Sequence, residues 1–335
     1  MRIRLILTLF IVFSLHLETH AQAPGVPVYK EGRGSRAEPE ARKTAQELRA
    51  KGELIDSDKV AEQLASRLKC KITLPNPSAL KLTSRELFER ARKGHMRVGW
   101  FYEDKKPARS GAVKPEPTGK LDVALEPKAA SKNMMRWRFN LSGGFVLTSD
   151  GAVATCFHVA APLDDETNGY LVAVDDEGHL YPVTEILAAS QDTDTCIVRI
   201  KAEKLTPLPL STDVVPGDKS LCFSEPMGKR GFYSEGIVNR FFARPLVKVR
   251  KKDPPPEHTP IWIEVSNDWA MGSSGSAVLD ERGNAIGHVC EIAPVVDDQV
   301  DLTAKKHPLF PGTVIIFHDA IAAQQVLALI EGARK

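Results

Sequence analysis

Three short segments of the sequence contain side chains that could together activate a nucleophile. They contribute His158, Asp194 and Ser274, in that order along the chain. A serine hydroxyl becomes an effective nucleophile when a base removes its proton, and an imidazole does this well when a carboxylate fixes its tautomer and stabilises the imidazolium. We therefore predict that His158 is the general base and acid, that Asp194 orients it, and that Ser274 is the nucleophile.

The surroundings of these residues support the same roles. Ser274 lies between Gly272 and Gly275, and glycine permits a tight turn in which backbone N–H groups converge on an oxyanion. Two other carboxylates, Asp164 and Asp192, compete for the role of the acid. We favour Asp194 because it alone directly precedes an aliphatic run typical of a strand.

The cysteines near these positions predict no metal site. Cys156 and Cys196 lie close to the histidine and the aspartate in the sequence, and we predict that both are buried strand thiols. Neither Cys-x-x-Cys nor His-Glu-x-x-His occurs, so no metal ligands are assigned. Residues 175–178 are predicted to form a hairpin turn instead of a calcium site, because further spaced carboxylates are missing.

The elements that must position these side chains are mainly strands. Short aliphatic runs bounded by Gly, Asp and Pro begin near Trp137 and predict an all-β body. Residues 319–335 have apolar side chains at helical spacing, which predicts a closing helix capped by Asp319. The clearest strand runs are residues 144–147, 170–174, 195–200 and 261–265.

A helical segment is predicted to precede this body. Val60, Leu64 and Leu68 are spaced four apart, as on one face of a helix. Thr83 followed by Glu86 predicts a capping box and a short helix over residues 84–93. Residues 104–132 are rich in Lys, Pro, Ala and Gly and are predicted to be a flexible loop or linker. We thus divide the chain into a helical segment, 22–94, and a main domain, 95–335.

The first residues have the pattern of a secretory signal peptide. Arg2 and Arg4 precede an apolar run of about 13 residues, shorter than the ~20 that span a bilayer, and small residues follow it. We predict a signal peptide over residues 1–21, with cleavage after Ala21 favoured over Ala23, and a secreted or periplasmic product. A retained anchor is the alternative interpretation, and no membrane association is expected after cleavage.

Composition limits the remaining function classes. The 335 residues are 42% hydrophobic and 26% charged, which is typical of a globular chain. Lys and Arg total 45 against 43 for Asp and Glu, so no nucleic-acid partner is indicated. Five cysteines are too few for a disulfide-rich scaffold.

At the chemistry-bearing residues the sequence resembles the trypsin-like serine peptidases, most closely the bacterial Deg/HtrA branch. Residues 142–151 are similar to the glycine-rich strand and turn that lead to that family's catalytic histidine, here His158. Asp194 matches the triad aspartate. Residues 272–277 match the nucleophile loop, so the resemblance implies that Ser274 is the nucleophile and that the N–H groups of Gly272 and Ser274 form the oxyanion hole.

The resemblance covers about residues 95–330 and also includes differences. It implies two six-stranded antiparallel β-barrels with the site between them and no cofactor. Ser273 stands where animal relatives have an aspartate, so activation by a newly cut N-terminus is not expected, and Ser276-Ala277 replaces the usual Gly-Pro. We expect no PDZ domain after the closing helix.

The resulting hypothesis is an exported serine endopeptidase that hydrolyses peptide bonds of protein or peptide substrates through an acyl-enzyme. Its main alternative is a weak or inactive protease-fold binding or scaffold protein, because a fold does not guarantee chemistry. An α/β-hydrolase esterase is disfavoured, since its triad runs Ser, acid, His along the chain. Substrate identity and oligomeric state cannot be inferred from the sequence.

Overall fold

The computed structural model describes Pro27, Tyr29 and residues 39–103, 137–162, 169–246, 258–296 and 313–333. The chain divides into two compact units, Met1–Lys30 and Glu31–Lys335, and the following description concerns the second unit. The predicted signal peptide, 1–21, and the predicted linker, 104–132, lie outside the described residues. Within the described part of the chain, no helix is long and apolar enough to span a bilayer.

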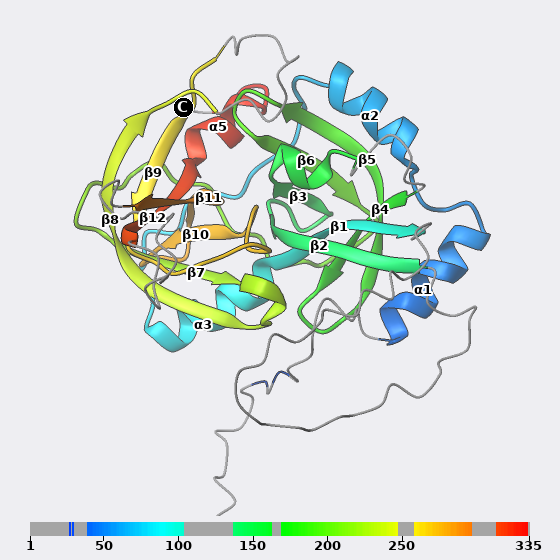
Figure 1. Cartoon of the computed structure of the whole chain (residues 1–335), viewed down its shortest axis with the longest axis horizontal. Helices are drawn as coiled ribbons and strands as arrows, with labels where there is room; N and C mark the ends of the chain where they lie inside the picture. Colours follow the sequence, from blue (N-terminus) through cyan, green and yellow to red (C-terminus); the bar gives the residue numbers. More distant parts are fainter. Residues whose placement is uncertain are drawn as a thin grey trace, which may run out of the picture. The chain divides into compact units, whose positions relative to one another are not determined.

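In the described part of the chain, twelve strands form two closed antiparallel barrels, as the family resemblance implied (Figure 1). The first barrel has the strand order β1-β2-β3-β6-β5-β4 and the second has the order β10-β11-β12-β9-β8-β7. The first six strands are β1 (His95–Glu103), β2 (Trp137–Val146), β3 (Ala152–Thr155), β4 (Gly169–Asp175), β5 (Leu180–Ser190) and β6 (Thr195–Ile200). The other six are β7 (Lys219–Ser224), β8 (Phe232–Ala243), β9 (Ile261–Val265), β10 (Ala277–Asp280), β11 (Ala285–Val296) and β12 (Thr313–Ala322).

Strand β1 shows how the sequence pattern fills the first barrel. Met96, Val98 and Trp100 alternate along the strand and are all buried in the core of this barrel. Phe101 belongs to a different buried cluster, with Phe139 of β2 and apolar residues of the first helix. Because successive side chains of a strand point to opposite faces, both faces of β1 are covered, which explains why its residues from His95 to Phe101 are all buried.

The predicted helical segment forms three helices that pack on the barrels. They are α1 (Pro39–Ala50), α2 (Ser57–Ser66) and α3 (Ser84–Gly94). Val60 and Leu64 of α2 are buried in the core of the first barrel, whereas Leu68 lies beyond the end of α2 and is 67% exposed. The capping box of Thr83 and Glu86 is confirmed at the start of α3.

The closing helix begins later than predicted. Helix α5 (Ala323–Ala328) is capped by Ala322 and not by Asp319, so the predicted cap was wrong. Asp319 lies inside β12, where its buried carboxylate pairs with Arg244 at 3.3 Å. The aliphatic residues around Asp319 thus belong to an alternating strand pattern and reach the helical pattern only after Ala322.

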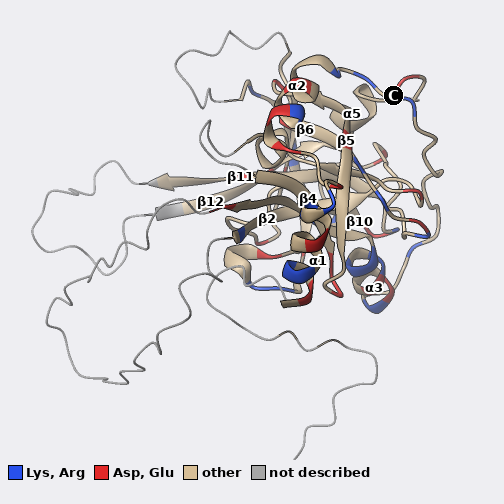
Figure 2. Cartoon of the chain, turned by 90° about the vertical axis from the view of Figure 1, so that its right-hand side faces the viewer, with Lys and Arg blue, Asp and Glu red and all other residues tan. Residues whose placement is uncertain are grey.

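Two further features connect distant parts of the chain. Cys70 and Ile330 form a parallel bridge: the Cys70 N–H donates to Leu329 O at 2.9 Å, and the Glu331 N–H donates to Cys70 O at 2.8 Å. Strands β11 and β12 continue past the second barrel as a projecting two-stranded ribbon (Figure 2). Apolar side chains on this ribbon are exposed, among them Ile292 and Ile316.

Candidate active site

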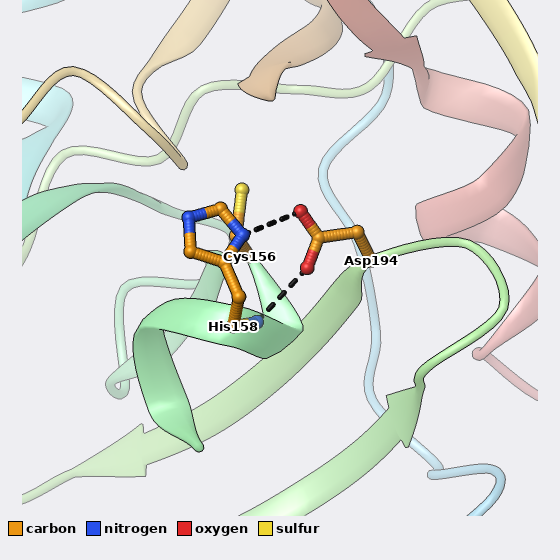
Figure 3. Close-up of side chains that lie close together, drawn as sticks. All are labelled: Cys156, His158 and Asp194. Atoms are coloured by element: carbon orange, nitrogen blue, oxygen red, sulfur yellow. Dashed lines mark hydrogen bonds and ion pairs between the residues drawn. The ribbon is translucent and has the colours of Figure 1, made fainter. Parts of the chain in front are cut away.

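His158 and Asp194 form a directly bonded pair in the first barrel (Figure 3). His158 lies in the one-turn helix α4 (Phe157–Ala160), immediately after β3, and Asp194 ends the turn before β6. The imidazole Nδ1 is 2.7 Å from Asp194 Oδ2, and the backbone N–H of His158 donates to Asp194 Oδ1 at 2.9 Å. Two hydrogen bonds thus fix the carboxylate against the residue that it was predicted to orient.

The backbone of Asp194 has a left-handed conformation, with φ of 44°. Aspartate is among the few non-glycine residues that adopt this region with some frequency. This turn places the carboxylate next to α4, where it accepts a hydrogen bond from the His158 N–H and is only 8% exposed. The rival carboxylate Asp192 instead accepts a hydrogen bond from the backbone N–H of His258 at 3.1 Å, and Asp164 lies outside the described residues.

The electrostatics of the pair suit a base supported by an acid. Burial alone lowers the pKa of His158, but the hydrogen bond and the negative charge of Asp194 outweigh it, so the pKa is raised above its ordinary value. For Asp194, burial raises the pKa, but the hydrogen bonds and charge of His158 lower it by more. The pKa of Asp194 is therefore below its ordinary value. The His158 side chain is 48% exposed and that of Asp194 8%, so the imidazole can reach a substrate while the carboxylate cannot.

Strand β11 supplies groups around Asp194 that the sequence analysis did not assign. The Cys290 thiol donates to Asp194 Oδ2 at 3.2 Å, and His288 Nε2 is 3.1 Å from Asp194 O. His288 is fully buried. Both residues come from the second barrel, and no sequence spacing links them to an aspartate almost a hundred residues earlier. Their place next to Asp194 becomes visible only in the folded protein, where β11 of the second barrel contacts the first barrel.

Ser274 lies in the loop before β10 and is hydrogen-bonded to backbone groups of other segments. Its hydroxyl donates to the backbone carbonyl of Cys290 at 3.5 Å, and its own carbonyl accepts a hydrogen bond from Ser142 Oγ at 3.0 Å. Within the described ranges there is no hydrogen bond between Ser274 and His158. The structure therefore brings His158 and Asp194 together directly and links Ser274 to them through Cys290.

Two N–H groups of the nucleophile loop have no hydrogen-bond partner in the described part of the chain, and they belong to Gly272 and Ser274. Other N–H groups of this loop are used: Ser273 donates to Ala270 O at 3.0 Å and Gly275 to Val289 O at 2.7 Å. Gly272 has φ of +96°, which glycine adopts without strain. Two free donors around a serine could hold an oxyanion, which is the arrangement predicted for these two residues.

The nucleophile loop packs against the first barrel through glycines. A Cβ on Gly143 of β2 would lie 2.5 Å from the Ser276 nitrogen and 2.9 Å from Ser273 O. A Cβ on Gly275 would lie 2.5 Å from Thr155 Oγ1 and 3.1 Å from the nitrogen of Cys156. Such distances leave no room for a side chain, so these glycines allow the two barrels to approach closely at the candidate site.

The other predicted features near the site have the expected positions. Cys156 and Cys196 are fully buried free thiols, as predicted, although Cys156 caps α4 instead of lying within a strand. Burial raises the pKa of both thiols above the ordinary value, which disfavours a role as nucleophiles. Residues 175–178 join β4 to β5 as a hairpin turn.

Comparisons with known proteins are consistent with this geometry. Residues 142–287 match the family model of the trypsin-like peptidase domain. No curated protein matches the sequence. The solved HtrA-type protease AlgW with a decapeptide is 17% identical, with 74% of this chain and 66% of that chain covered and a TM-score of 0.47. A variant of AlgW with a tripeptide is 16% identical, with coverages of 73% and 62% and a TM-score of 0.46.

This chain thus spans slightly less than two thirds of the AlgW chains that it matches. The family model covers the segments that hold His158, Asp194 and Ser274. Together with the pair of closed six-stranded barrels, this match supports a trypsin-like peptidase domain over residues 142–287.

Proposed function

We propose that this protein is an exported serine endopeptidase that hydrolyses peptide bonds through a triad of Ser274, His158 and Asp194. The observation that carries the proposal is the contact of 2.7 Å between His158 Nδ1 and Asp194 Oδ2, which leaves Nε2 of a half-exposed imidazole free to act as a base. Export rests on the signal-peptide pattern of residues 1–21. The substrates are proteins or peptides, as the peptidase family implies.

In the proposed reaction, His158 Nε2 removes the proton of Ser274 Oγ as this oxygen attacks the peptide carbonyl. The N–H groups of Gly272 and Ser274 then bind the oxyanion, and Asp194 stabilises the imidazolium. The imidazolium returns its proton to the leaving amine, and a water molecule hydrolyses the acyl-enzyme by the same route. Before attack, the Ser274 hydroxyl must exchange its bond with Cys290 O for one with His158, which requires a change of side-chain rotamer.

The proposal is tested by replacing the nucleophile. Ser274→Ala should lower the turnover of a fluorogenic casein or peptide mixture by roughly four orders of magnitude, because the acyl-enzyme cannot form. Ser149→Ala provides a matched control, since Ser149 lies on an exposed turn away from the site. Cleavage that survives Ser274→Ala unchanged would refute the assignment.

A binding or scaffold protein with this fold is the second candidate. It is favoured by one observation, that Ser274 bonds to the Cys290 carbonyl and not to His158. A serine-directed fluorophosphonate separates the two, because it should label the intact protein but not Ser274→Ala. Failure to label the intact, folded protein would favour the scaffold. The esterase alternative is excluded by the fold, since all pairings between the described strands are antiparallel.

A further inference from the structure

Three metal-ligating side chains gather around one carboxylate oxygen, Oδ2 of Asp194, which is itself a fourth possible ligand. His158 Nδ1 lies 2.7 Å from it and the Cys290 thiol 3.2 Å. The Cys156 thiol contacts both Asp194 and the Cys290 thiol, and it also donates to Val289 O at 3.2 Å. Figure 3 shows the Cys156 sulfur beside the imidazole and the carboxylate, and the ligand atoms of these three residues all lie within 4.8 Å of one another.

Two of these separations are known, 2.7 and 3.2 Å, and three of the four donors lie within 4.8 Å of one another, so they can be compared with the spacing of ligands around a small ion. A zinc ion holds sulfur at about 2.3 Å and nitrogen or oxygen at about 2.0–2.2 Å, so neighbouring ligand atoms lie roughly 3.4–3.8 Å apart. The distances of 2.7 and 3.2 Å are slightly shorter than this, because shared protons now join the groups. Small outward rotations of the side chains would make room for an ion. Two thiols with one imidazole and one carboxylate favour a soft or borderline ion such as Zn²⁺ over Mg²⁺ or Ca²⁺.

The scaffold around the four donors is rigid and largely closed. His158 belongs to α4 and Cys156 immediately precedes it, Asp194 belongs to the turn before β6, and Cys290 to β11 of the second barrel. Cys156 is fully buried and Asp194 is nearly so. His288 Nε2 lies 3.1 Å from the backbone oxygen of Asp194. Hydrogen bonds to the ligating residues are typical of metal sites and orient their donors. The half-exposed imidazole leaves an entry from the surface.

The geometry points to an inhibitory zinc site made of Cys156, His158, Asp194 and Cys290. Binding of Zn²⁺ deprotonates the two thiols and releases two protons to solvent. It also takes up the lone pair of His158 Nδ1, so the ring proton moves to Nε2. An imidazole protonated at Nε2 cannot remove a proton from Ser274. The inhibition rests on the proposed peptidase function, whereas the binding of the metal does not.

The metal site is tested first without reference to catalysis. Co²⁺ is added to the full-length Ser274→Ala protein, and the near-ultraviolet charge-transfer band of cobalt bound to thiolates is recorded. We expect one Co²⁺ per chain, displaced by Zn²⁺, and at least tenfold weaker binding in Cys156→Ala and Cys290→Ala. Cys222→Ala is the matched control, since Cys222 is a buried thiol in the core of the second barrel, and it should bind as the parent does.

Proton release provides a measurement that needs no further variant. Zn²⁺ added to the weakly buffered Ser274→Ala protein should release about two protons per ion bound, the number that two thiol ligands supply. The absence of a thiolate band, or a band that both Cys156→Ala and Cys290→Ala retain when circular dichroism shows them folded, would overturn the site.

Inhibition is then measured on the intact sequence. Zn²⁺ should block peptide cleavage, a chelator should restore it, and Cys222→Ala should behave in the same way. Cys156→Ala should need at least tenfold more Zn²⁺ for the same inhibition. If the protein cleaves no peptide at all, the proposed function fails while the cobalt band still decides the metal site. A cobalt band in an enzyme whose cleavage zinc leaves unchanged would overturn the inhibitory role.

Discussion

A buried histidine, His95, should make the fold sensitive to acid. His95 begins β1 and is 3% exposed, with its ring edge-on to Phe223 at 5.3 Å between centroids. Neither of its ring nitrogens has a hydrogen-bond partner among the described residues. Burial, together with the positive charges of Arg97 and Arg230, lowers its pKa to about 3. Protonation inside the fold is therefore strongly disfavoured.

The magnitude follows from the difference in proton binding between the two states. In the unfolded chain His95 titrates near its ordinary pKa of about 6.5, so between about 6.5 and 3 the unfolded state binds one more proton. The contribution of His95 to stability is complete above pH ~6.5 and is lost as the pH falls towards 3. Between about pH 7 and pH 4 this loss amounts to about 3 kcal/mol, on the order of a third of the stability of a typical domain.

Urea unfolding at a series of pH values measures this pH-dependent contribution of His95 to the free energy of unfolding. Other groups also titrate in this range, so the wild type is compared with His95→Leu, which has an apolar side chain of similar size and cannot titrate. The free energy of unfolding of the variant should fall about 3 kcal/mol less over the same pH interval. His258→Gln is the control, because His258 is exposed, and it should follow the wild type. If the free energy of unfolding fell equally with pH for the wild type and for His95→Leu, the reasoning would be refuted.

Two substitutions test the packing. Gly143→Ala should lower kcat at least tenfold with a smaller effect on KM, because its Cβ would press on Ser276 and move the nucleophile loop; a kcat equal to that of the wild type in steady-state assays would contradict this. Leu64→Ala should cost about 2–5 kcal/mol in urea unfolding, since Leu64 fills the core of the first barrel, whereas Leu68→Ala should change stability by less than about 0.5 kcal/mol. Equal effects of the two would show that α2 is not part of the core.

The architecture was predictable from the sequence where the signal was local. Short aliphatic runs between turn residues marked the strands, and Thr83 with Glu86 marked the start of α3, because these patterns depend on neighbours in the chain. The closure into two barrels came from the family resemblance and not from strand periodicity. Asp319 was misassigned because an acidic residue before an aliphatic run is typical of a helix cap, while its partner Arg244 is distant in sequence.

The candidate site was predictable in part. The contact between His158 and Asp194 agrees with the roles predicted from their order and their place next to strands. The bond from Ser274 to the carbonyl of Cys290 was not predictable, because a side-chain rotamer depends on the surrounding packing. Cys290 and His288 were missed for a similar reason: nothing in the sequence around these two residues of β11 indicates that they contact Asp194.

The bridge between Cys70 and Ile330 joins segments from opposite ends of the described sequence. Forming a contact between residues so far apart in the sequence costs a large loss of chain entropy. Such a contact therefore stabilises the protein only after the intervening parts have folded. We therefore expect both barrels to assemble before the bridge between Cys70 and Ile330 forms. Amide hydrogen exchange at Glu331, whose N–H donates to Cys70 O, reports directly on that last step of folding.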